Sequence, residues 1–154
     1  MKYAHSIKLT VFSYENENSR NILDGFLRFF PFNPEDNKAA LKKSAATGFN
    51  EAKIETLEIT LTKNNLISQF LENLLNNLDE NQKKLILEQI ESRLDENLDF
   101  FLRFDKELWV KEHKLLLTDS GRCFHMKLSV AAFPKKREAA LNAVRELFSG
   151  KPNK

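Results

Sequence analysis

The opening segment YAHSIKLTVF alternates between two kinds of side chain at every second position. One side carries Tyr3, His5, Ile7, Leu9 and Val11, and the other carries Ser6, Lys8 and Thr10. Because side chains of a β-strand point alternately to opposite faces, this pattern predicts a strand with one buried and one exposed face. A strand of this kind is typical of an antiparallel sheet that is covered on one side only.

The rest of the chain continues with strand-like and helix-like segments in a definite order. Strands are expected over residues 3–12, 52–62, 98–105, 114–118 and 122–133, and helices over residues 19–30, 34–48, 66–78, 79–94 and 134–148. The segment KELWVKEH, residues 106–113, fits either a helical turn or a bent strand. This order predicts an α+β domain with two layers, in which helices pack on one face of a mostly antiparallel sheet of about five strands.

Length and composition limit the class of protein. A chain of 154 residues can bury one hydrophobic core, so we expect a single domain over residues 1–148 and a flexible tail over residues 149–154. The single cysteine, Cys123, cannot form an intramolecular disulfide, which favours a reducing cytoplasm. Since the sequence has neither a signal-peptide pattern nor a run of about twenty apolar residues, we expect no membrane span.

The sequence offers little that predicts catalysis. The four glycines are too widely spaced for a phosphate-binding loop, and one Cys with three scattered His residues does not match a zinc site. Cys123 and His125 share a face of one expected strand and could form a thiol-base pair, but a sheet-face thiol beside an exposed imidazole is the commoner arrangement. We therefore expect no catalytic residue, metal or cofactor.

Charge is unevenly distributed along the chain, although the net charge is only +2. Residues 72–99 include eight acidic and three basic residues, whereas residues 134–154 include six basic and two acidic residues. Such a polarity can give a nearly neutral protein one cationic face suited to phosphate groups. The candidate contacts are Lys135, Lys136, Arg137, Arg103, Lys106, Lys127, Lys8 and His5.

Four short motifs follow one another along the chain: His5-Ser6-Ile7, Glu15-Asn16-Glu17, Leu102-Arg103-Phe104-Asp105-Lys106-Glu107 and Pro134-Lys135-Lys136-Arg137-Glu138-Ala139. In order and spacing they resemble an archaeal RNA-binding family described as predicted exosome subunits. The resemblance covers almost the whole chain. It implies a fold like that of the ribosomal protein that binds 5S ribosomal RNA. It also implies a non-catalytic role in binding structured or double-stranded RNA, connected with RNA processing or degradation and possible exosome or ribosomal partners.

Two readings of the charged segments stay open. In the first, Lys135, Lys136 and Arg137 occupy the first turn of the last helix, where the helix dipole disfavours cations and a phosphate would relieve that cost. In the second, the basic residues only maintain solubility, and the helical layer over residues 66–94 docks on a protein partner without direct RNA contact.

Overall fold

The computed structural model describes residues 2–47 and 52–149. The described elements are β1 (Ala4–Tyr14), α1 (Ser19–Arg28), the 3₁₀-helix η1 (Glu35–Asn37), β2 (Lys42–Thr47), β3 (Lys53–Leu61), α2 (Asn64–Asn77), α3 (Glu80–Glu88), α4 (Ile90–Arg93), β4 (Asp99–Asp105), α5 (Lys106–Glu112), β5 (Cys123–Val130) and α6 (Arg137–Phe148). Within this part of the chain, no helix is long and apolar enough to cross a bilayer.

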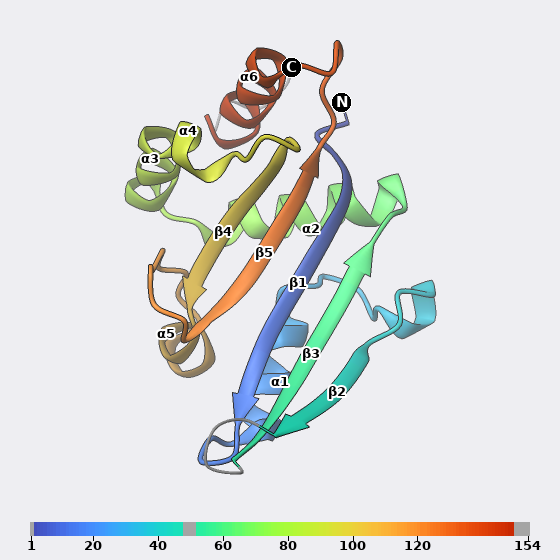
Figure 1. Ribbon diagram of the computed structural model, residues 1–154, viewed down its shortest axis with the longest axis vertical. Helices are drawn as coiled ribbons and strands as arrows, with labels where there is room; N and C mark the ends of the chain where they lie inside the picture. Colours follow the sequence, from blue (N-terminus) through green and yellow to red (C-terminus); the bar gives the residue numbers. More distant parts are fainter. Residues whose placement is uncertain (1, 48–51, 150–154) are drawn as a thin grey trace.

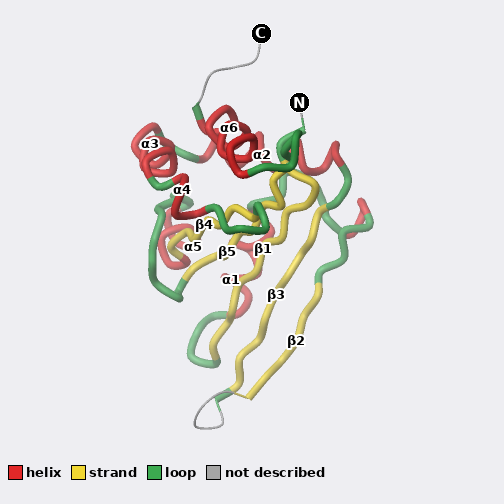
Figure 2. Tube along the Cα trace, turned by 45° about the horizontal axis from the view of Figure 1, so that its top comes forward, coloured by secondary structure: helices red, strands yellow, loops and turns green. Residues whose placement is uncertain are grey.

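The five strands form one sheet in the order β2-β3-β1-β5-β4, and every neighbouring pair is antiparallel. Helices α1 and α2 lie behind the sheet in Figure 1, whereas no described helix crosses its near face between β2 and β5. Figure 2 shows the helical elements gathered behind the sheet and at its upper end. The expected α+β architecture with helices on one face is therefore confirmed.

The buried face of the sheet follows the alternation in the sequence. Leu9 on β1 lies between Ile59 on β3 and Met126 on β5, and all three side chains are buried. Aromatic side chains fill the space between this face and the helices, as the centroid of the Phe29 ring lies 4.8 Å from that of Trp109. Because these positions face the helices, the intervening residues of the central strands face outward.

The two edges of the sheet differ in how they are covered. On the β4 edge, the Asp105 amide donates to the Leu116 carbonyl at 2.8 Å, and the Thr118 amide donates to the Arg103 carbonyl at 3.0 Å. On the β2 edge, all six residues from Lys42 to Thr47 are exposed. Thus β2 is the strand edge that is open for pairing in the described structure.

The expected helix over residues 34–48 is wrong. Residues 35–37 form only the turn η1, which ends at Lys38 in the left-handed conformation with φ 63°. The following segment, Lys42–Thr47, forms β2 by pairing with β3. Pairing with β3, the next strand along the chain, therefore overrides the local helical signals. The expected helix end near Gly48 lies outside the described residues.

The expected strand over residues 114–118 is also wrong, because only Leu117 forms an isolated bridge, to Phe104. The Leu117 amide donates instead to the Gln82 side chain at 2.8 Å. The expected helix over residues 79–94 is divided at Gln89 into α3 and α4. Asp79 caps the start of α3, since its carboxylate accepts from the Gln82 amide at 2.8 Å.

The ends of the chain differ from expectation at two points that affect the site. The pairing of β1 with β5 shifts register between Ala4 and Ser6, so Ala4 is buried and His5 is exposed. The last helix begins at Arg137 with Lys136 as its N-cap, rather than at Pro134. Of the expected tail over residues 149–154, all but Ser149 lie outside the described residues.

Candidate nucleic-acid interface

The open face of the sheet carries a cluster of basic side chains. Lys8 on β1 lies directly opposite Lys127 on β5, and Arg103 on β4 lies directly opposite His125 on β5. Residues opposed in this way have Cβ atoms about 4.5–5.5 Å apart. We call these four residues the basic face. They alternate with the buried residues of their strands, so they belong to the sheet face opposite the helices α1 and α2, which lie behind the sheet in Figure 1.

The basic face is unfavourable for the isolated protein. Like charges directly opposite each other on neighbouring strands destabilise a sheet, and Lys8 and Lys127 form such a pair. Asp99 relieves part of this repulsion, because its Oδ2 atom lies 3.5 Å from Lys127 Nζ. Among the described residues, Lys8 and Arg103 take part in no ion pair, so their charge is available to an anion.

His125 reports the electrostatic potential of this face. Burial lowers its pKa, and the charges of Arg103, Lys8 and Lys127 lower it further. All three cations lie close enough to the His125 imidazole to disfavour its protonated, positively charged form. An anion placed over His125 would reverse this effect and favour the imidazolium.

Arg93, at the end of α4, extends the positive potential, although sequence reasoning counted it within the acidic segment. Its Nη2 atom donates to the Gln89 side chain at 2.6 Å. Burial lowers the Arg93 pKa, Asp119 raises it, and Arg103 lowers it further. A hollow of about 340 Å³ lies here, lined by Gln89, Ser92, Arg93, Phe101, Arg103 and Asp119. The position of Arg93 beside β4 depends on the fold and was not visible in the sequence.

Aromatic rings accompany the cations on the same side of the sheet. The Phe101 ring centroid lies 5.6 Å from that of His125, while Phe12 and Tyr14 on β1 are 43% and 36% exposed. Aromatic side chains on an open sheet can stack against unpaired bases. The signal was present in the sequence, because Phe12 and Phe101 interrupt the otherwise polar side of their strands.

The basic triplet does not occupy one helical turn. Lys135 and Lys136 are exposed and precede α6, whereas Arg137 is its first residue. The Arg137 guanidinium donates to the Leu94 carbonyl at 3.0 Å and to the Glu91 carbonyl at 2.7 Å. Arg137 therefore satisfies carbonyls at the end of α4, which is a structural role that the sequence did not predict.

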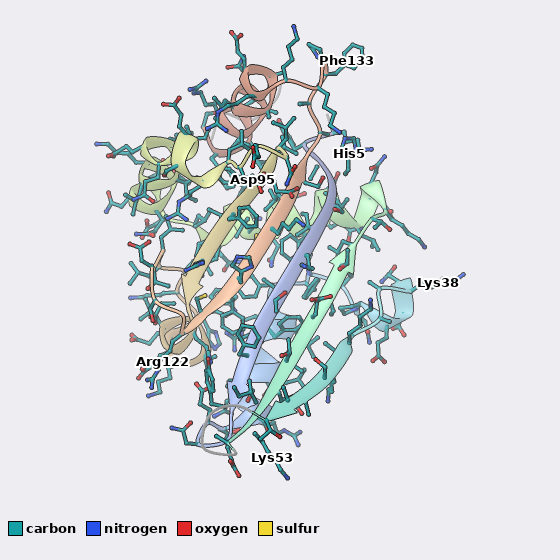
Figure 3. The ribbon with its side chains drawn as sticks, viewed as in Figure 1. His5, Lys38, Lys53, Asp95, Arg122 and Phe133 are labelled. Carbon is teal, nitrogen blue, oxygen red and sulfur yellow. The ribbon has the colours of Figure 1, made fainter. Side chains whose placement is uncertain are left out.

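Two further candidates lie away from the basic face. Lys106, which we expected beside Arg103, is only 3% exposed. Its Nζ atom donates to the Phe12 carbonyl at 2.7 Å and to Glu17 Oε1 at 2.9 Å. Lys106 is thus directed into the protein. His5 is exposed near the start of β1, toward the upper end of the sheet in Figure 3.

The sheet does not activate Cys123 as a nucleophile. Cys123 is buried, and burial raises the pKa of its thiol despite the opposing effect of Arg103. A nucleophilic cysteine needs the opposite shift, toward the thiolate. Within residues 2–47 and 52–149, no group of three or more His, Cys, Asp or Glu side chains could hold a metal ion.

Comparisons with known proteins agree with the motifs. A family model described as RNA binding matches residues 6–130. The chain is 31% identical over 150 residues to the RNA-binding protein PAB1135 of Pyrococcus abyssi, covering 96% of this chain and 95% of that protein.

Solved structures share the fold. The protein AF2318 of Archaeoglobus fulgidus, assigned to DUF54, is 29% identical with a TM-score of 0.81, covering 94% of this chain and 99% of that chain. The DUF54 protein Mth689 of Methanothermobacter thermautotrophicus is 24% identical with a TM-score of 0.76, covering 95% and 98%.

Proposed function

The chain belongs to the RNA-binding family, and from this premise we propose that it binds RNA through the basic face of its open sheet. The observation that carries the proposal is the gathering of Lys8, Arg103 and Lys127 around His125 on a face that no described helix crosses. Cations held at fixed spacing on such a face can contact successive phosphates without reading base sequence.

The chemistry of the four side chains suits a ribose-phosphate backbone. Arg103 presents a planar guanidinium, which can make two parallel hydrogen bonds to one phosphate, whereas Lys8 and Lys127 act as point charges. These groups leave the base edges unread, so we propose structured or double-stranded RNA as the ligand, recognised by shape and backbone. Lys135, Lys136 and His5 are proposed as peripheral contacts.

We further propose that the protein is a non-catalytic component of RNA processing or degradation in the cytoplasm. The relative PAB1135 is named for RNA binding, and the raised pKa of Cys123 weighs against thiol chemistry here. Exosome or ribosomal components are the proposed partners, on the strength of the sequence resemblance. Recovery of the same RNA-bound particles from cells with the wild-type chain, but not with a basic-face variant, would support this assignment.

The direct test is a salt titration of binding to double-stranded RNA, single-stranded RNA and DNA of equal length. Replacing Lys8, Arg103 and Lys127 with Ala in one variant should weaken binding. The slope of log affinity against log salt should become shallower by up to about 2.7, at about 0.9 for each lost phosphate contact. A charge-matched control removes Lys83, Lys84 and Lys111, which lie on helices α3 and α5.

The control variant should retain the wild-type slope, because its lysines are not on the open face. Equal slopes for wild type and the basic-face variant would refute the proposal. A preference for DNA over both RNAs would overturn the choice of ligand.

A second candidate function is protein assembly through β2. This strand is the uncovered edge of the sheet, and its residues are all exposed. A partner strand could add to its free backbone groups. The helical layer is a weaker docking surface, because the apolar stripe of α2, including Phe70 and Leu74, is buried in the core. Co-purification that survives nuclease and high salt, and is lost when Ala45 is replaced by Pro, would favour assembly.

A further inference from the structure

Phe133 is an outlier among the aromatic residues of this protein. Its side chain is 99% exposed, whereas Phe26, Phe70 and Phe100 are fully buried. Figure 3 places Phe133 at the upper end of the molecule, beyond the end of the sheet. A fully solvated phenyl ring forfeits the favourable transfer out of water that the other rings gain, so the isolated fold gives no reason for a Phe at this position.

The segment that presents Phe133 is held at both ends. On one side, the Ala131 amide donates to the Tyr3 carbonyl at 2.8 Å. On the other side, the Lys136 amide donates to the Pro134 carbonyl at 2.8 Å, and the Arg137 guanidinium is fixed on the end of α4. The ring is therefore presented from an anchored loop rather than from a free end.

Two lysines accompany the ring. Lys135 and Lys136 are exposed, and within the described structure neither forms an ion pair. They line a cleft of about 560 Å³ whose other side carries Asp95 and Glu96. The cleft therefore carries charges of both signs, which disfavours contact with a broad anionic surface here.

We propose that Phe133 stacks against an unpaired base of the bound RNA while Lys135 and Lys136 contact its adjoining phosphates. An exposed flat apolar ring beside two free cations matches the chemistry of a nucleotide, which joins an aromatic base to a phosphate. This inference rests on the proposed function and narrows its ligand. The preferred RNA is a duplex with an unpaired nucleotide beside it, because the basic face takes the backbone and Phe133 takes the base.

The first experiment compares a blunt RNA duplex with the same duplex carrying a short single-stranded overhang. Phe133→Ala should weaken binding of the overhang duplex between about 5-fold and about 100-fold, and it should leave the salt dependence unchanged because stacking releases no counterions. Replacing Lys135 and Lys136 with Ala should instead make the salt dependence shallower. Leu116→Ala is the matched control, since the Leu116 side chain is also exposed, at 44%. This variant should bind RNA with wild-type affinity.

A second experiment reads the contact directly. Phe133→Trp should show fluorescence quenching when the overhang RNA is added, because a base stacks on the indole. Trp109 provides a constant background, since it is only 1% exposed.

Wild-type affinity for Phe133→Ala, with no quenching of Phe133→Trp, would overturn the inference while leaving RNA binding intact. A blue shift with anionic phospholipid vesicles but not with RNA would assign the ring to a membrane and also overturn it. Absence of RNA binding by the wild-type protein would overturn both proposals.

Discussion

Lys106 offers the clearest test of whether a basic residue of this protein stabilises the fold or binds RNA. Its ammonium group contacts the Phe12 carbonyl at 2.7 Å and both oxygens of Glu17, at 2.9 Å and 3.2 Å. Lys106→Met keeps most of the apolar stem but removes the charge. The Phe12 carbonyl then loses this donor, and the Glu17 carboxylate loses its ion-pair partner.

The expected loss of stability can be worked from these contacts. Removing one partner of a buried ion pair costs about 3–5 kcal/mol. Here the value should lie lower, at about 2–4 kcal/mol, because the Glu17 side chain is 26% exposed and water can solvate part of its charge. For a chain of this size each kcal/mol lowers Tm by about 2–4 °C, so the melting temperature should fall by roughly 5 to 15 °C.

The measurement is thermal and urea unfolding, combined with RNA titration below the melting temperature. The folded Lys106→Met protein should bind RNA with wild-type affinity and salt dependence, because the ammonium faces inward. Lys111→Met is the matched control: Lys111 pairs with Glu107 at 2.9 Å, but both side chains are exposed, so Tm should not change measurably. The double variant with Glu17→Gln should recover part of the lost stability.

If Lys106→Met leaves Tm unchanged but weakens RNA binding and flattens its salt dependence, the structural role assigned to Lys106 is refuted.

Two further predictions concern Arg137 and His125. Arg137→Ala should destabilise the fold by about 0.5–1.5 kcal/mol in urea unfolding, because two carbonyls at the α4 end lose a donor that water only partly replaces. Replacing Lys135 and Lys136 should leave stability unchanged. For His125, the folded-state pKa lies below the ordinary value of 6.5, so the unfolded chain takes up the proton first. Stability from this group is complete above about pH 6.5 and falls below it. His125→Gln should flatten that part of the stability-pH curve, and an unchanged curve would contradict this origin.

The sequence predicted correctly which side chains lie on the open face of the sheet wherever a strand shows its own apolar-polar alternation. Lys8, Arg103 and Lys127 each lie between two buried residues on their own strands, so their outward orientation follows from the two-residue period of a strand. The same logic missed β2, because KKSAAT has no apolar alternation and becomes a strand only by pairing with β3. It also misplaced His5, since a register shift between Ala4 and Ser6 interrupts the period.

The sequence could not distinguish cations that hold the fold together from cations available to a ligand. The partner of Lys106 is Glu17, 89 positions away, and Arg137 meets Leu94 across 43 positions. From the sequence alone, Lys106 and Arg137 cannot be distinguished from Lys127 or Lys135. The distinction depends on whether a hydrogen-bond donor already has an acceptor inside the protein.

This criterion changes the interface that the family resemblance implied. The PKKRE motif suggested one triplet of equivalent phosphate contacts, but Arg137 already donates to two carbonyls while Lys135 and Lys136 stay exposed. Two of the five N–H donors of the Arg137 guanidinium are bound to these carbonyls, so the group is held on α4 and only its remaining donors are available to a phosphate. Arg137 instead anchors the loop from which Phe133 and the two lysines project. In the proposed interface, the motif thus combines an anchor with the contacts that it positions, and the proposed centre of binding moves to the open face around His125.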